Sequence, residues 1–405
     1  MKSKMQRDVN WKEILYLACL CTYIIISTLV GEGSILTYIP LVKWEHYIAF
    51  INMIKALFVL KMIFDIAEEP RMIFLIAITE TIGFMVYTHN PTDVFLSMAL
   101  WFLCAGKNVR ARKITECLFG SHLVSFIILE SLCAAGIVPL GKTIKSGHLV
   151  ASYSLGFSHP NTAASKILQL VLLFWLLRKG RLRLVHYLGI IITMVFVKTV
   201  TDCSTVVLLL GLLLICTVLY NKRGVTQFLY RKITVVRNLF LAGYLGVLGI
   251  TTVFVCLCKD GEIFKKLFGT FGARIAEAVK YYQYYGFSLW GQPLMYYKSD
   301  PKEAEKAGLY TLDNGYMYLL LGFGIVLFLY FIFLHAGTLW WMFERRRLDY
   351  VIVYGIFFIY GFLETLVIRT GMNFTLFYLF GFIWEYYDRR KQVENSRSRR
   401  LWQKN

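Results

Sequence analysis

The sequence predicts an all-α integral membrane protein with about twelve transmembrane helices and a large extracytoplasmic loop that contains short helices. Three observations support this prediction. Hydrophobic residues make up 57% of the chain and the mean hydropathy is +0.56, which is too apolar for a soluble domain. Apolar runs of roughly the length needed to cross the hydrocarbon recur along the chain. Lys and Arg concentrate between alternate runs, as in cytoplasmic loops.

The apolar runs define the predicted helices. An even number of crossings places both termini on one side, and most of the 44 Lys and Arg residues fall in segments on that side. The positive-inside rule therefore predicts that both termini are cytoplasmic. The fourth run is short, and the seventh and eighth are barely separated. The runs lie near 13–30, 47–66, 71–88, 92–106, 115–137, 161–178, 184–200, 203–220, 238–258, 314–335, 349–368 and 371–388.

The chain divides into four parts on this plan. An N-terminal bundle of about nine spans occupies 1–258, and the large extracytoplasmic loop occupies 259–313. About three further spans fill 314–388, and 389–405 is a basic cytoplasmic tail predicted to be disordered. The formal net charge of +19 follows from membrane orientation and attraction to anionic lipid. A nucleic-acid partner is therefore not expected.

A first polar motif lies where the outer loop near 138–160 enters the sixth run. Asn161 is a good N-cap and Pro160 prevents an earlier helix start, so a simple helix start accounts for both. It does not account for His159. A histidine beside the positive end of a helix dipole is placed to hold a phosphate oxygen or to activate a hydroxyl.

Other polar residues stand at the predicted starts of inward-running helices. Asp202 precedes the eighth run, and Asp313 or Asn314 stands at the start of the tenth. Together with Asn161, these starts would direct free N–H groups at the outer loops and favour an anion such as a diphosphate. Each of them is equally well explained as an ordinary cap.

The large loop contains a predicted amphipathic helix with an arginine in it. Ile275, Ala278, Val279 and Tyr282 follow the i, i+3, i+4, i+7 pattern of a helix lying at the bilayer surface. Arg274 is the sharper signal, because a guanidinium can fork two phosphate oxygens. A solvated surface arginine is the alternative.

Charged residues also occur inside the predicted spans. Lys55 and Glu80 fall at matching depth in neighbouring helices, which predicts a buried pair serving either structure or proton relay. Glu130, Lys166, Glu364 and Arg369 lie in outer halves of spans, near the loops. Arg369 could neutralise a lipid diphosphate.

The sequence lacks the common motifs for metal, cofactor and nucleotide chemistry. The nine cysteines fall almost entirely in apolar runs and form neither a disulfide framework nor a zinc pattern. The sequence contains no nucleotide-binding glycine motif, metalloprotease motif or nucleophile elbow. We therefore expect no metal, no cofactor and no ATP hydrolysis.

Three short segments occur in a recognisable order: 156–161 (GFSHPN), 272–274 (GAR) followed by Gly286 and Gly291, and 312–316 (LDNGY). In this order they resemble the Wzy-type polymerases of the O-antigen polymerase and ligase superfamily, in the style of Gram-positive capsule or exopolysaccharide enzymes. The likeness also covers the hydropathy plan of most of the chain. Members often carry an Asn-Ser-Arg-Thr-like segment before the eighth span, whereas 201–205 reads TDCST. The arginine-to-glycine spacing in the large loop is loose as well.

The resemblance implies a membrane glycosyltransferase of the bacterial cytoplasmic membrane. Such an enzyme joins oligosaccharide repeats carried on undecaprenyl diphosphate into capsular, exopolysaccharide or O-antigen chains at the outer face. It needs no metal or nucleotide sugar, and its partners would be membrane lipid, a flippase and a chain-length regulator. By this likeness, His159 or Asp313 would take the proton of the attacking hydroxyl. The implied substrate-binding residues are Arg274, Arg369, Asn161, Asn314, Tyr316 and Lys166.

Three alternatives remain open. A flippase or transporter of lipid-linked saccharides would use midplane charges such as Lys55 and Glu80. Transporters tend to have inverted repeats and helices broken by Gly or Pro, and neither is evident in the sequence. An O-antigen ligase usually has a histidine in the large loop, and 259–313 contains none, which favours a polymerase. A sugar O-acetyltransferase would change substituents and leave chain length unaltered.

Overall fold

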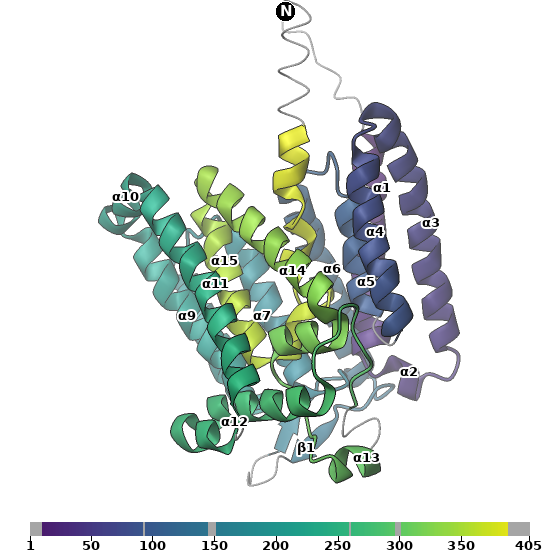
Figure 1. The fold of residues 1–405 in the computed structure, drawn as a ribbon, viewed down its shortest axis with the longest axis vertical. Coiled ribbons are helices and arrows are strands. Elements are labelled where there is room, and N and C mark those ends of the chain that lie inside the picture. The colour runs from purple at the N-terminus through teal and green to yellow at the C-terminus, as the bar shows by residue number, and fades with distance from the viewer. Residues whose placement is uncertain (1–9, 92–93, 145–150, 259–260, 296–300, 388–405) are drawn as a thin grey trace, which may run out of the picture.

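The computed structural model describes residues 10–91, 94–144, 151–258, 261–295 and 301–387, and it is almost entirely helical (Figure 1). Within those ranges, nine helices are long and apolar enough to cross a membrane. This confirms the all-α class and a multi-pass membrane protein. The nine are α1 (Trp11–Ile26) continued by the π-helix η1 (Ser27–Glu32), α3 (Trp44–Glu68), α4 (Met72–His89), α6 (Ala111–Ala134), α7 (Pro160–Leu177), α8 (Leu184–Phe196) continued by η2 (Val197–Thr201), α9 (Ser204–Asn221), α11 (Ile233–Leu257) and α14 (Gly315–Glu344).

Shorter elements complete the bundle and cover its ends. Two strands pair antiparallel, with Thr143 opposite Ser152. A large hydrophobic cluster joins buried side chains from α1 to Trp384, so the three predicted divisions that fall within the described residues share one core. The remaining elements are α2 (Ile35–Tyr38), α5 (Val94–Ala105), β1 (Lys142–Ile144), β2 (Ala151–Tyr153), α10 (Arg223–Arg231), α12 (Glu262–Tyr285), α13 (Pro301–Lys306), α15 (Leu348–Leu363), η3 (Thr365–Ile368) and η4 (Phe374–Tyr378).

The two ends of the bundle differ in what they carry. We call one the outer end: it holds α2, α12, α13 and the strand pair (Figure 1). The opposite end, here the basic end, holds the start of α1, α10 and the last described helix, 381–387. The described chain therefore begins and ends on the same side. The predicted tail, 389–405, lies outside the described residues.

The predicted amphipathic helix is present as α12, which lies across the outer end (Figure 1). Ala276, Ala278, Val279 and Tyr281 are buried. Burial raises the pKa of Tyr281, so its hydroxyl stays protonated and donates to the carbonyl oxygen of Met295 over 2.9 Å. The large loop is thus folded onto the bundle.

At the C-terminal end the described structure departs from two of the predicted helical runs, those near 349–368 and 371–388. α15 is a 16-residue helix, and in the run predicted at 371–388 the described residues, 371–387, hold only η4 and the helix 381–387. Hydropathy detects burial but not helicity. Irregular backbone is tolerated at membrane depth where protein groups bond it. Here Tyr354 donates its hydroxyl to the Thr375 carbonyl oxygen over 2.7 Å, and Thr338 donates to that of Leu379 over 2.9 Å.

A second irregularity interrupts α14. At Gly324 the backbone angles, φ +86° and ψ 167°, are not helical. The loop between α12 and α13 supplies the missing partners: Ile325 N donates to Ser288 O over 3.0 Å, and Gln292 N donates to Gly322 O over 3.0 Å. The expectation that no helix is broken at glycine is therefore wrong. A single glycine inside an apolar run does not predict from sequence that the helix is interrupted there.

We expect Gly291→Ala to lower the free energy of unfolding by about 3 kcal/mol through overpacking and backbone strain. Gly291 has φ +96°, and a Cβ there would lie 2.4 Å from the Gly322 carbonyl oxygen. Gly249→Ala in α11 is the control, since a Cβ there meets nothing within 4 Å. The midpoint temperature of thermal unfolding in detergent should be lower than that of the wild type for Gly291→Ala only. Equal midpoints would contradict the close packing at the α14 break.

Candidate functional site

One face of α7 carries a line of polar side chains through the bundle. Asn161, Ser165 and Gln169 recur at i, i+4 and i+8, with Lys166 beside them, so all four lie on one side of the helix. The partners of Asn161, Ser165 and Gln169 belong to the end of α15 and to the irregular segment after it. Asn161 Nδ2 donates to Glu364 Oε1 over 3.1 Å, and Gln169 Nε2 donates to the Gly371 carbonyl oxygen over 3.0 Å. Ser165 bonds the Tyr360 hydroxyl.

The start of α7 differs from the prediction in which residue caps it. His159, not Asn161, is the N-cap: its Nδ1 accepts a hydrogen bond from the main-chain N of Asn161 over 3.1 Å. Pro160 occupies the first helical turn, as predicted. Asn161 is thereby freed to bond Glu364. The loop before the helix is tied to η1, because Ser158 N donates to the Glu32 carbonyl oxygen over 3.0 Å.

Four residues meet at the outer end, and we call them the outer site: His159, Asn161, Arg274 and Glu364. Arg274 comes from α12, so the large loop reaches the start of α7 and the end of α15. Its Nη2 lies 3.8 Å from Glu364 Oε1, with side-chain exposures of 16% and 8%. That distance is too long for a hydrogen bond.

Arg274 keeps donor capacity in this arrangement. Its Nε is buried without a hydrogen-bond partner among the described residues. A buried donor left unpaired is costly, which makes an incoming acceptor oxygen favourable there. The nearby Glu364 carboxylate can accept a proton. The outer site thus combines an anion-binding donor with a buried base.

Lys166 is buried and contacts the protein itself. It forms what we call the deep ion cluster with Glu32, Thr28 and His122. Its Nζ lies 2.6 Å from Glu32 Oε2, 2.9 Å from Thr28 Oγ1 and 3.4 Å from His122 Nδ1, and all four side chains are buried. Nζ also donates to the Gly371 carbonyl oxygen over 2.5 Å. All of these contacts are with protein groups, and the predicted substrate contact of Lys166 stays a prediction.

Arg369 lies two residues before Gly371, on a turn of the irregular segment after α15, and is half-buried. Its carbonyl oxygen accepts from Met372 N and Asn373 N, both over 2.8 Å. The next residue, Thr370, bonds the Tyr23 hydroxyl over 2.6 Å. Arg369 therefore stands on a turn held on both sides, two residues before Gly371.

The residues predicted at the start of α14 have mainly structural contacts. Asn314 Oδ1 accepts from Tyr316 N and Met317 N over 3.1 and 3.0 Å, as an N-cap. Tyr316 is buried and donates its hydroxyl to the Phe358 carbonyl oxygen over 3.1 Å. Half-buried Asp313 interacts electrostatically with Tyr281 of α12.

The predicted floor of open helix starts does not form as expected. His159 and Asn314 occupy N–H groups at the starts of α7 and α14. Asp202 is not the cap of α9: it adopts a left-handed conformation, φ +47°, and pairs with Lys198 over 2.6 Å. The anion-binding capacity of the outer end therefore rests on side chains.

The predicted midplane charges lie near each other. Lys55 Nζ is 5.9 Å from the centroid of the Trp101 ring and interacts electrostatically with Glu80. Glu80 also interacts with Cys104 by a hydrogen bond. This environment agrees with the pairing expected from matching depth.

Sequence reasoning missed the roles of Glu32 and Gln169. Glu32 falls at the end of the first apolar run, where a carboxylate is ordinarily read as marking the membrane interface. The polar spacing along α7, at i, i+4, i+5 and i+8, was the available signal, because an apolar helix with such a face must bury it against protein.

Among the described residues, no group of three or more His, Cys, Asp and Glu side chains is arranged to hold a metal ion. Comparisons with protein families, curated proteins and solved structures find no match. Inference about function therefore starts from the outer site and from the sequence resemblance.

Lys166→Met should lower the free energy of unfolding by about 3–5 kcal/mol, because it leaves Glu32 buried without its counter-charge. Adding Glu32→Gln to Lys166→Met should recover part of the lost free energy of unfolding, because the uncompensated charge of Glu32 disappears. Thermal unfolding of the two single variants and the double variant in detergent measures the coupling. Additive losses would show that the two charges act independently.

Proposed function

We propose that this protein is a membrane glycosyltransferase that joins undecaprenyl-diphosphate-linked oligosaccharide repeats, in the manner of the Wzy-type polymerases it resembles, at the outer face of a bacterial cytoplasmic membrane. The observation that carries the proposal is the outer site. Arg274, from the large loop, lies 3.8 Å from Glu364 beside Asn161 at one end of a membrane bundle. Arg274 and Asn161 belong to two of the segments on which the resemblance rests.

The proposed reaction transfers the growing glycan from its lipid diphosphate to the incoming unit. A sugar hydroxyl of the incoming unit attacks the anomeric carbon of the growing chain. A carbon–oxygen bond forms to the acceptor, and the bond to the diphosphate oxygen breaks. The diphosphate leaves with the bonding electron pair, where Arg274 would stabilise its charge. Arg369, on its clamped turn, would bind the second diphosphate.

Glu364 is the acceptor we favour for the hydroxyl proton. His159 uses Nδ1 to accept from the main chain, so its neutral ring carries the proton on Nε2 and can donate but not accept there. Glu364 is a buried carboxylate held by Asn161. This choice revises the sequence-based proposal of His159 or Asp313 as the base.

A transporter of lipid-linked saccharides is the second candidate, and one observation favours it. α14 is broken at Gly324, and the backbone after α15 is irregular between 364 and 380. Broken helices at membrane depth are common in transporters. In that case Lys55 and Glu80 would be the functional charges.

We expect Arg274→Ala and Glu364→Gln to reduce polymer formation by about a hundredfold or more, because they remove a transition-state charge contact and the base. Lys266→Ala is the matched control, as an exposed cation on the same helix. The measurement is a gel ladder from purified protein reconstituted with a defined undecaprenyl-linked repeat.

Lys55→Ala separates the two candidate functions in cells. A polymerase should tolerate this change and lose polymer with Arg274→Ala. Full-length polymer in Arg274→Ala cells, together with repeats trapped inside Lys55→Ala cells, would overturn the polymerase and favour the transporter.

A further inference from the structure

A cavity of about 730 Å³ has lining residues at the start of α1 and in the helix 381–387. Both of these elements lie at the basic end, away from the outer site (Figure 1). We call this cavity the basic cavity. Its deep lining is apolar and includes Leu103, Phe377 and Phe380, all buried. Its polar lining includes Arg110 and Arg345. A cavity of this size suits a small molecule or a lipid headgroup.

The two arginines are oriented in a similar way. Arg110 donates from Nε and Nη2 to Glu13 over 3.0 and 2.9 Å. Arg345 donates from Nε to Glu385 over 2.9 Å and pairs with the same carboxylate through Nη2. A guanidinium has five donors. In the part of the chain that the structure describes, no hydrogen bond to a carboxylate uses Nη1 of either residue, so both keep donors for an anion.

Trp384 adds an independent sign of a missing ligand. It lines the cavity and is only 7% exposed, and its Nε1 has no acceptor among the described residues. A buried indole N–H normally has a partner. An oxygen-bearing ligand in the cavity would supply one.

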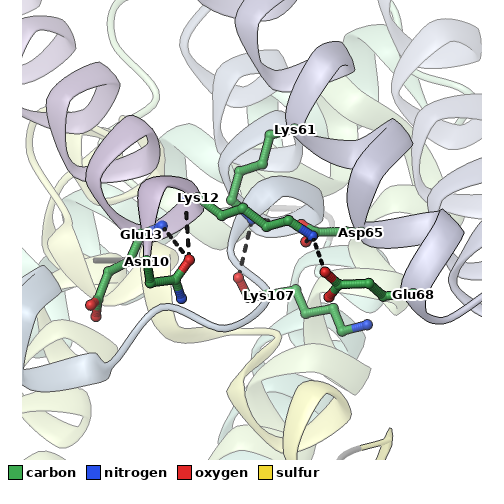
Figure 2. Close-up of polar contacts among 7 residues, drawn as sticks. All are labelled: Asn10, Lys12, Glu13, Lys61, Asp65, Glu68 and Lys107. Carbon is green, nitrogen blue, oxygen red and sulfur yellow. Dashed lines mark hydrogen bonds and ion pairs between the residues drawn. The ribbon is translucent and has the colours of Figure 1, made fainter. Parts of the chain in front are cut away.

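The wall of the cavity is held in place before any ligand arrives. Figure 2 shows Lys61 donating to the main-chain carbonyl oxygen of Lys107, over 3.1 Å, in the segment that leads to Arg110. Lys61 is itself paired with Asp65 over 2.6 Å, and Lys12 bridges Asp65 and Glu68. In the same view Glu13 points away from this cluster, and it is the residue that binds Arg110.

We propose that the basic cavity binds the phosphate group of an anionic membrane lipid, with the guanidinium groups of Arg110 and Arg345 and the indole N–H of Trp384 as donors. Each arginine of the lining already pairs with a carboxylate: Arg110 with Glu13, Arg345 with Glu385 and Arg347 with Asp349. The preference for a phosphate therefore rests on the guanidinium N–H groups that remain and on the indole N–H, which are donors that phosphate oxygens can accept. The apolar deep lining suits the first carbons of the lipid chains. Basic pockets between transmembrane helices bind such headgroups. The proposal is independent of the reaction at the outer site.

The test compares two matched arginines on α6 and its entry. Arg110 and Arg112 have side-chain exposures of 64% and 68%, and each pairs with one glutamate. Of these two arginines, Arg110 lines the cavity and Arg112 does not. Purified full-length protein is delipidated and titrated with phosphatidylglycerol in neutral detergent, and bound lipid is counted by native mass spectrometry. Phosphatidylcholine is the competing lipid.

Arg110→Gln should weaken phosphatidylglycerol binding by about tenfold, and Trp384→Phe should weaken it several-fold, whereas Arg112→Gln should bind as the wild type does. Unfolding midpoints without added lipid show whether each variant is folded. Equal weakening by Arg110→Gln and Arg112→Gln would overturn the site, because surface charge alone would then explain binding. Competition by glycerol 3-phosphate at equal concentration would overturn a lipid as the source of the phosphate.

Discussion

The Lys166 ammonium group is the constraint on which the outer half of the structure depends. It is buried, and it gathers a carboxylate from η1, a hydroxyl from the same π-helix, an imidazole from α6 and a main-chain carbonyl from the segment after α15. In hydrocarbon, a non-helical stretch persists only if protein groups bond its backbone. Lys166 and Gln169 both donate to Gly371, so α7 holds the irregular segment inside the bundle.

That clamp also explains why the outer site has its composition. Once the 364–373 segment is fixed to α7, Glu364 must face the start of that helix, and Asn161 can bond it only because His159 takes over the capping role. Arg274 then approaches from α12. A close fit at Gly371 supports the arrangement, because a Cβ there would lie 2.0 Å from Glu32 Oε1. The site is thus a product of backbone bonding more than of direct pairing between its charges.

Much of this architecture could be predicted, and the failures have a common cause. Hydropathy located nearly all the long helices, and the helical spacing of apolar residues located α12. The sequence singled out Arg274 and Asn161 separately, and the approach of both to Glu364 is seen only in the structure. The break at Gly324 and the irregular segment at 364–380 were missed, because apolar composition is the same whether the backbone is helical or not. Lys166 was placed at the right depth, but its partner Glu32 could be identified only in three dimensions.

The interrupted α14 gives the large loop an unusual mechanical role. Three main-chain hydrogen bonds splice residues 288–292 into the gap around Gly324. The middle of the large loop is therefore hydrogen-bonded to the transmembrane helix α14. These bonds also anchor the C-terminal end of α12, which directly precedes them in the chain. The other part of α12 joins this anchored end through the bend at Gly269, where φ is +55° and an added Cβ would meet nothing within 4 Å.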